Sequence, residues 1–229
     1  MSLTLAQLNA APLAQAAQML AGVYEHSPWV AEAALQQRPY RSLAHLKHAL
    51  VQAVRSAEPS AQLGLIRAHP ELAGRLAPLS HESTHEQAQV GLQACSPEEL
   101  ATLRRLNAEY LAKFGWPFIV AVRGPRGTGL TRQEIIATLA RRVAHPADFE
   151  HAECLRQIHR IAELRLNDKF GFEPVQGNQV WDCAELLAQH SDERGALTVT
   201  YLTPAHRACR QQLAHWMREC GFDEVSTDT

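Results

Sequence analysis

Apolar residues recur at helical spacing along almost all of this 229-residue chain, whereas alternating runs of β-branched residues are scarce. This periodicity predicts an all-α fold. We expect helices over residues 12–22, 28–36, 42–55, 60–68, 70–76, 83–93, 97–114, 131–143 and 147–168. Ser96 followed by Glu99, and Thr131 followed by Glu134, are capping boxes that mark two of the helix starts. The predicted architecture is a single-domain bundle of about eight or nine helices with a C-terminal helical fragment.

The composition narrows the class of protein. A hydrophobic content of 46% can fill one core, and Lys+Arg 22 against Asp+Glu 24 leaves a net charge of -2 without any basic stripe. These features argue against a nucleic-acid or membrane partner, and no apolar run approaches the ~20 residues of a membrane span. The N-terminus lacks the basic start of a secretory signal. Five cysteines without CxxC spacing favour free thiols, so we expect a cytoplasmic protein.

Three short blocks carry the residues that suggest chemistry. Residues 67–74 read Arg-Ala-His-Pro-Glu-Leu-Ala-Gly, residues 83–87 read Ser-Thr-His-Glu-Gln, and residues 114–119 read Phe-Gly-Trp-Pro-Phe-Ile. They combine a histidine held just before a proline, a carboxylate in the first turn of an expected helix, and an apolar strip that can exclude water from a ligand. His69 and Glu86 are therefore candidates for acid/base chemistry on a small molecule.

Both residues also have a purely structural interpretation. His69 could be a satisfied polar group at a helix start, with Pro70 as the first helical residue. Glu86 could simply close a capping box onto Ser83. A functional role is compatible with the second interpretation, because the amides and the positive end of that helix would form a site for an anion. An imidazole with an unperturbed pKa of ~6.5 is suited to exchanging a proton with a hydroxyl.

Residues 81–85, His-Glu-Ser-Thr-His, spell the H-E-x-x-H signature of zinc peptidases. Zinc binding requires both histidines on one face of one helix. If Ser83 is the N-cap, His81 falls outside the helix and does not converge with His85. A zinc-dependent hydrolase that uses His81 and His85 is thus an alternative function, and a non-catalytic helical binding module is another.

The wording of the three blocks resembles that of the OHCU decarboxylases, which act on 2-oxo-4-hydroxy-4-carboxy-5-ureidoimidazoline (OHCU) at the last step from urate to (S)-allantoin. The resemblance begins near Leu8, includes residues 24–32 and ends around residues 161–166. One departure is Trp116, where the family usually has a smaller aromatic residue. The resemblance implies a carboxy-lyase of purine catabolism whose partner is the small-molecule substrate OHCU, and a homodimer is expected.

The resemblance also implies the roles of individual residues. His69 and Glu86 correspond to catalytic residues. Arg165 would otherwise be read as a surface helix residue, but a guanidinium can bind a carboxylate or urea in bidentate fashion. No cofactor or metal is expected, because a C=N bond of the substrate can accept the electron pair that CO2 leaves behind. The implied substrate-binding residues are Pro70, Ser83, Thr84, Gln87, Phe118, Ile119, Val120, Ala121, Val122 and Arg165.

A domain boundary is predicted at residues 169–177, where a long helix runs into glycine and proline. The decarboxylase domain would span residues 1–172, and residues 173–229 would be a linker and a separate tail. Residues 197–207 and 216–221 of this tail resemble the opening segment of the allantoate amidohydrolases, whose metal-binding residues come further on. We interpret the tail as an incomplete segment of that family that could connect the protein to neighbouring ureide-pathway enzymes.

Overall fold

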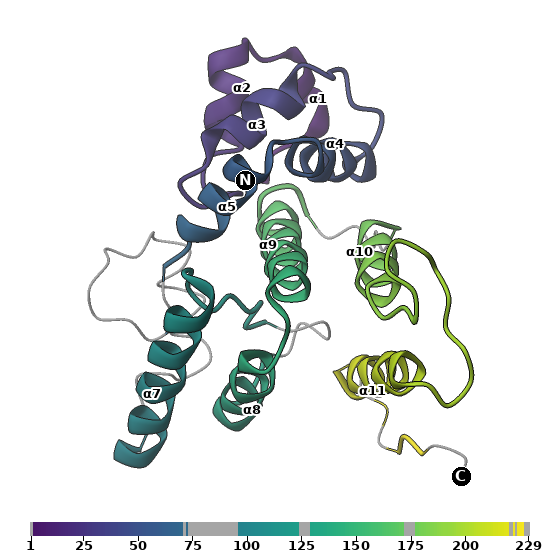
Figure 1. Ribbon diagram of the computed structural model, residues 1–229. Coiled ribbons are helices and arrows are strands. Elements are labelled where there is room, and N and C mark those ends of the chain that lie inside the picture. The colour runs from purple at the N-terminus through teal and green to yellow at the C-terminus, as the bar shows by residue number, and fades with distance from the viewer. Residues whose placement is uncertain are drawn as a thin grey trace.

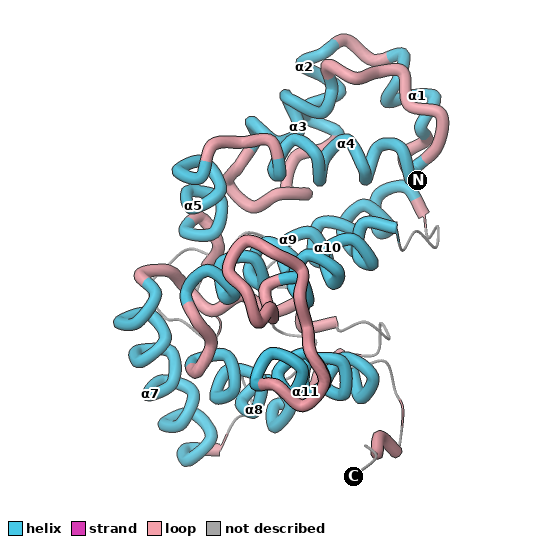
Figure 2. Tube along the Cα trace, turned by 45° about the vertical axis from the view of Figure 1, so that its right-hand side comes forward, coloured by secondary structure: helices cyan, strands magenta, loops and turns pink. Residues whose placement is uncertain are grey.

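The protein is helical throughout the part of the chain that the structure describes. The computed structural model describes residues 2–70, 72, 96–123, 129–171, 177–219, 222 and 224–226. Helices occur in these ranges and strands do not, as Figures 1 and 2 show. The all-α prediction is confirmed, while the helices predicted over 70–76 and 83–93 lie outside the described residues. None of the described helices is long and apolar enough to cross a membrane.

The other predicted helices are present with similar bounds. The observed helices are α1 (Leu5–Ala10), α2 (Leu13–Met19), α3 (Pro28–Leu35), α4 (Leu43–Arg55), α5 (Pro59–Arg67), α7 (Pro97–Phe114), α8 (Arg132–Val143), α9 (Ala147–Phe170), α10 (Gly177–Ala188) and α11 (Pro204–Glu219). Helix α1 was not predicted. It has only six residues, too few to show a periodic pattern, although Thr4 and Gln7 form a capping box at its start.

Local capping explains where two long helices begin. The backbone N–H of Ser96 donates to Glu99 at 2.9 Å, and the N–H of Glu99 donates to the Ser96 hydroxyl at 3.2 Å. Thr131 and Glu134 make the same reciprocal pair at the start of α8. Both capping boxes read from the sequence are therefore confirmed. Helix α7 ends at Gly115, whose φ of 75° lies in the left-handed region that favours glycine.

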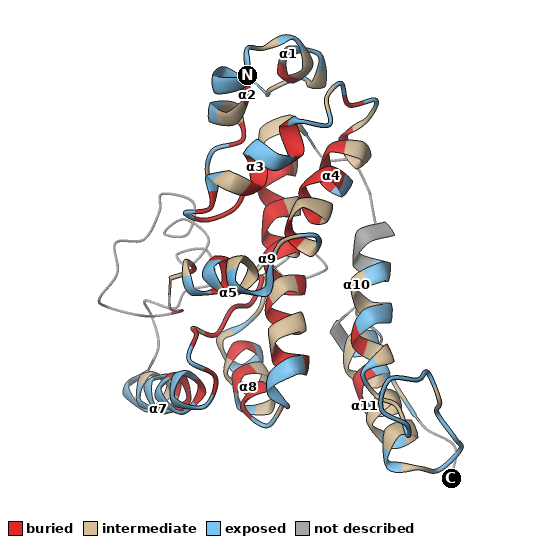
Figure 3. Cartoon of the chain, turned by 45° about the horizontal axis from the view of Figure 1, so that its top comes forward, coloured by how far each residue is buried: buried red, intermediate tan, exposed pale blue. Residues whose placement is uncertain are grey.

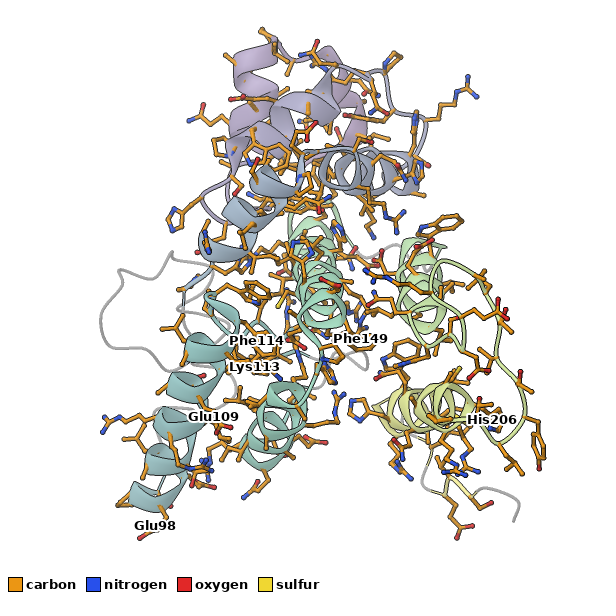
Figure 4. All side chains as sticks on the ribbon, in the orientation of Figure 1. Glu98, Glu109, Lys113, Phe114, Phe149 and His206 are labelled. Carbon is orange, nitrogen blue, oxygen red and sulfur yellow. The ribbon has the colours of Figure 1, made fainter. Side chains whose placement is uncertain are left out.

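Helix α9 is the centre of the fold. Buried residues recur along the whole length of this 24-residue helix, which is why it is largely red in Figure 3. Helices α4, α5 and α10 pack against it, α3 packs on α4, and α7 packs on α8. Lys113, at the end of α7 towards α9 in Figure 4, donates to the carbonyls of Val143 at 2.6 Å and His145 at 2.8 Å. Side chains from several helices thus pack against α9.

The tail helices α10 and α11 pack against the rest of the bundle. Asp182 of α10 forms an ion pair with Arg55 of α4, and Arg141 of α8 donates to His215 of α11 at 2.8 Å. The tail is nevertheless much less buried than the rest (Figure 3). The large apolar residues exposed in it are Val180, Trp181, Leu197, Val199, Tyr201, Leu202, Leu213, Met217 and Phe222.

Candidate active site

His69 lies two residues beyond the last residue of α5. The N–H of Ala68 and the N–H of His69 still bond to carbonyls of that helix, at 3.0 and 3.2 Å. On the other side of Pro70, the Asn107 side chain of α7 donates to the carbonyl of Leu72 at 2.9 Å. The chain on both sides of the histidine is therefore held by helices, and His69 itself is only 8% exposed.

The two ring nitrogens of His69 have different surroundings. Nδ1 lies 3.4 Å from the carbonyl oxygen of Leu65, which can only accept a hydrogen bond. We therefore place the proton on Nδ1. Nε2 is buried and has no hydrogen-bond partner among the described residues. This arrangement leaves a lone pair on Nε2 for a ligand.

The charge state of His69 follows from its burial. Burial lowers the pKa of this imidazole from 6.5 to about 4, because the charged form loses its hydration. The carboxylate of Glu25 acts in the opposite direction and raises the pKa, whereas the guanidinium of Arg165 lowers it. His69 is consequently neutral at pH 7. A neutral imidazole with an available lone pair can act as a general base.

Glu25 and Arg165 form a buried ion pair beside His69. Arg165 Nη2 and Glu25 Oε2 are 2.8 Å apart, and the side chains are 4% and 1% exposed. Arg165 Nη1 also donates to the carbonyl of Gly22 at 2.9 Å. The structure thus brings Arg165 close enough to influence the pKa of His69, while its predicted contact with the substrate stays a prediction.

Glu25 was not predicted to take part in the site. Residues 24–29 include Tyr24, Pro28 and Trp29, which indicate packing rather than chemistry. The one available signal was a carboxylate inside an otherwise aromatic and proline-rich block, since such a group must find a partner when it is buried. The partner, Arg165, could not be read from the neighbouring sequence.

The apolar strip Phe118–Val122 runs along α9. It forms neither a helix nor a strand. The Ile119 carbonyl accepts from Arg142 Nη1 at 2.6 Å, and the Ala121 N–H donates to Gln157 Oε1 at 2.9 Å. Arg123, just beyond the strip, binds Asp168 in bidentate fashion at 3.0 and 2.6 Å. The strip therefore approaches the end of α9 that carries Arg165.

All five residues of the strip are buried, with exposed fractions of 2 to 8%. The Ala121 amide already donates to Gln157, so this particular group is committed to the protein. The substrate-binding role implied for the strip then concerns its other backbone groups. The strip can also exclude water from a ligand, because its side chains are apolar.

Several predicted site residues lie outside the described part of the chain. Glu86, Ser83, Thr84 and Gln87 belong to this group, as do His81 and His85 of the zinc-peptidase signature. Pro70 is described and half-buried next to His69. Within the described residues there is no group of three or more His, Cys, Asp or Glu side chains that could hold a metal ion.

A second buried polar cluster, which the sequence did not predict, surrounds Glu150 near the start of α9. Its carboxylate accepts from Arg142 Nε at 2.8 Å, from His145 Nδ1 at 2.7 Å and from the Tyr110 hydroxyl. Burial alone would raise the pKa of Glu150, but the Arg142 guanidinium and these hydrogen bonds hold it below its usual value. The cluster is an internal salt bridge that joins α7, α8 and α9.

Comparisons with known proteins identify the family of this chain. The family model for OHCU decarboxylase matches residues 9–167. The 2-oxo-4-hydroxy-4-carboxy-5-ureidoimidazoline decarboxylase of Haloferax volcanii is 39% identical over 171 residues, which are 75% of this chain and 98% of that protein. The mouse protein of the same name is 31% identical over 168 residues, covering 72% of this chain and 92% of its own length.

Longer relatives match as well. The uric acid degradation bifunctional protein of a Bacillus species is 37% identical over 166 residues, and the match covers 72% of this chain but only 32% of that protein. A crystal structure of (S)-allantoin synthase superimposes with a TM-score of 0.59 at 31% identity, covering 73% of this chain and 54% of that one. The family model and these relatives show that the chain belongs to the OHCU decarboxylase family.

Proposed function

We propose that this protein is a carboxy-lyase that converts OHCU into (S)-allantoin and CO2 in urate degradation, without a cofactor. Membership of the OHCU decarboxylase family supports the substrate. The observation that carries the proposal is the buried, neutral His69 with a lone pair on Nε2. Such a group is what a base for a substrate hydroxyl requires.

The substrate carries a carboxylate and a hydroxyl on one ring carbon, next to a C=N bond. When the bond to the carboxylate breaks, CO2 leaves and the released electron pair forms a C=C bond to the neighbouring carbon, while the electrons of the C=N bond move onto nitrogen, which takes up a proton. His69 Nε2 accepts the hydroxyl proton, so that the hydroxyl oxygen becomes a carbonyl oxygen. The electrons of the C=C bond then return to the neighbouring carbon, which takes up a proton on one face, and this sets the (S) configuration of the product.

Arg165 and Glu25 set the electrostatics around the base. The positive guanidinium favours the neutral imidazole and attracts an anionic substrate. Its ion pair with Glu25 limits this effect and keeps two buried charges compensated. We assign Arg165 to the binding of the substrate carboxylate or ureido oxygen.

The remaining assignments follow the family resemblance. Glu86 would fix the charge state of His69 and hold substrate N–H groups. The other residues that would contact the ligand are Pro70, Ser83, Thr84 and Gln87. Backbone groups of the strip would hold its ring oxygens.

The cellular setting is also a proposal. We infer a cytoplasmic homodimer, with the tail as the contact to neighbouring enzymes of the pathway. Two relatives from Bacillus carry the name uric acid degradation bifunctional protein, and the match to this chain covers about a third of each. Such relatives support the idea that the decarboxylase unit can be joined to a second activity.

The test uses substrate made in place, by oxidising urate in the presence of the hydrolase that precedes this step. Circular dichroism should show a single-handed product that forms faster than the spontaneous reaction, together with release of CO2. Racemic product at the uncatalysed rate would contradict the proposal. Loss of activity with EDTA and its recovery with zinc would instead favour the hydrolase based on His81 and His85.

A further inference from the structure

Tyr24, the residue before Glu25, is anchored to the middle of α9. Its hydroxyl lies 2.9 Å from Nδ1 of His159, and both side chains are buried. Their rings meet edge to face, with centroids 6.0 Å apart. Together with the ion pair between Glu25 and Arg165, this hydrogen bond ties two consecutive residues of one loop to two places on the same helix.

A small cavity lies behind this hydrogen bond. Its volume is about 30 Å³, and its walls include Tyr24, His159, Lys47 of α4 and Asp182 of α10. Asp182, one of the lining residues, forms an ion pair with Arg55 of α4. Two further helices, α4 and α10, therefore line the cavity next to the Tyr24–His159 hydrogen bond.

Neither partner of the hydrogen bond becomes charged near neutral pH. Burial lowers the pKa of His159 to about 3, and the nearby guanidinium of Arg55 adds to this effect. Burial also raises the pKa of the Tyr24 hydroxyl far above its usual value. The bond consequently supplies no proton and no charge to the site, and what it can supply is position.

We propose that Tyr24 and His159 are positioning residues, whose hydrogen bond holds the Glu25 carboxylate at the place where it acts on His69. This inference rests on the proposed function, since it assigns a role within the same site. Glu25 is flanked by His26, whose φ of 47° is unusual for a residue with a side chain. A loop in this conformation needs external anchors, and the bond to His159 is one of them.

The charges that face His69 make the proposal measurable. Glu25 raises the pKa of His69, whereas Arg165 and His26 lower it. If Glu25 is released from its place, the contribution that raises the pKa is lost. The pKa of His69 should then fall, and the acidic limb of the kcat/KM profile should move to lower pH.

The experiment compares Tyr24→Phe with Glu25→Gln and with a matched control. We expect both variants to shift the acidic limb in the same direction, with the smaller shift in Tyr24→Phe. The kcat of Tyr24→Phe should fall on the order of 10-fold through misplacement, with a smaller change in KM. Tyr40→Phe removes another buried tyrosine hydroxyl, which donates to Ala34, and should leave the profile unchanged.

Two variants of the partner separate position from packing. His159→Leu removes the acceptor and should reproduce Tyr24→Phe. His159→Asn keeps a hydrogen-bonding atom near the place of Nδ1 and should recover most of the wild-type profile. An unmoved profile in Tyr24→Phe, or equal shifts in Tyr24→Phe and Tyr40→Phe, would overturn the proposal.

An NMR titration of His69 in the ligand-free protein gives a readout that does not need turnover, with His69→Asn used to assign its signal. A lower pKa of His69 in Tyr24→Phe supports the positioning role even if OHCU turns out not to be the substrate. An unchanged pKa in a protein that makes (S)-allantoin would refute the positioning role alone. The two failures are therefore distinguishable.

Discussion

Helix α9 carries two buried ionic clusters that differ in one respect. Around Glu150, each buried polar atom of Arg142, Tyr110 and His145 has a partner. In the cluster of His69, Glu25 and Arg165, the Nε2 atom of the histidine has none within the described residues. Buried polar atoms in proteins are nearly always bonded, so an exception requires an explanation. This difference fits the proposal that the Glu150 cluster serves the fold and the His69 cluster serves a ligand.

The largest expected effect comes from replacing His69, the proposed base. His69→Asn should reduce kcat by ~10²–10⁴-fold, because general acid/base catalysis is lost while a polar side chain of similar size remains. Thermal unfolding followed by circular dichroism should show an intact fold. His151→Asn, which removes a half-buried imidazole of α9, is the control and should keep its activity. Near-normal turnover of His69→Asn would place His69 in the same structural class as Glu150.

The next largest effect concerns the Glu150 cluster, whose buried polar atoms all have partners. Arg142→Met should reduce the free energy of unfolding by about 3–5 kcal/mol, because it leaves Glu150 as a buried charge without its main partner. Turnover per folded molecule should change little. Urea unfolding and kcat at saturating substrate measure the two quantities separately. A large loss of kcat in a stable Arg142→Met variant would show that the two clusters are not functionally distinct.

Acidification below pH 6.5 should reduce the free energy of unfolding, because His69 is protonated more readily in the unfolded chain than in the folded protein. The pKa of His69 is about 4 in the folded protein and 6.5 in the unfolded chain, and that of His159 is about 3 in the folded protein. Below pH 6.5 the unfolded chain binds more protons, so stability is lost as pH falls. The shift of His69 corresponds to about 3 kcal/mol.

Urea unfolding between pH 7 and 4.5 at constant ionic strength tests this expectation. The His69→Asn variant should show a shallower slope, because one of the two histidines no longer contributes. Glu153, whose pKa is lowered to about 2 mainly by Arg156 against the effect of burial, contributes only below pH 4.5 and does not interfere. Equal slopes in both proteins would mean that folding does not lower the pKa of His69.

The smallest effect is expected where an ion pair is exposed. Arg105 and Glu109 of α7 are 3.4 Å apart, but their side chains are 66% and 51% exposed. Arg105→Ala should change the free energy of unfolding by less than about 0.5 kcal/mol. A change similar to that of Arg142→Met would show that burial is not what distinguishes the Glu150 cluster.

The helices could be predicted because their signals are local. Apolar spacing and the capping boxes at Ser96 and Thr131 are contained within a few neighbouring residues, and the structure has helices at both places. The histidine at position 69 could also be singled out, because a proline follows it directly and its block resembles that of a known family.

The partners of the buried charges could not be predicted from local patterns. Tyr24 and His159 are 135 residues apart in the chain, and Arg165 reaches a carbonyl 143 residues away. Arg165 would have been read as a surface residue without the family resemblance. Glu150 and Arg142 resemble ordinary exposed helix residues in the sequence, and only the packing of α7, α8 and α9 reveals their burial.

The Nε2 atom of His69, which has no hydrogen-bond partner within the described ranges, has a consequence for protein engineering. A buried polar atom without a hydrogen bond destabilises a protein by ~1–3 kcal/mol. His69→Met would fill a similar space without such an atom, and it should raise the melting temperature while it abolishes catalysis. Selection for thermal resistance alone would therefore tend to remove the base. Any stabilised variant of this protein should be screened for turnover at every round.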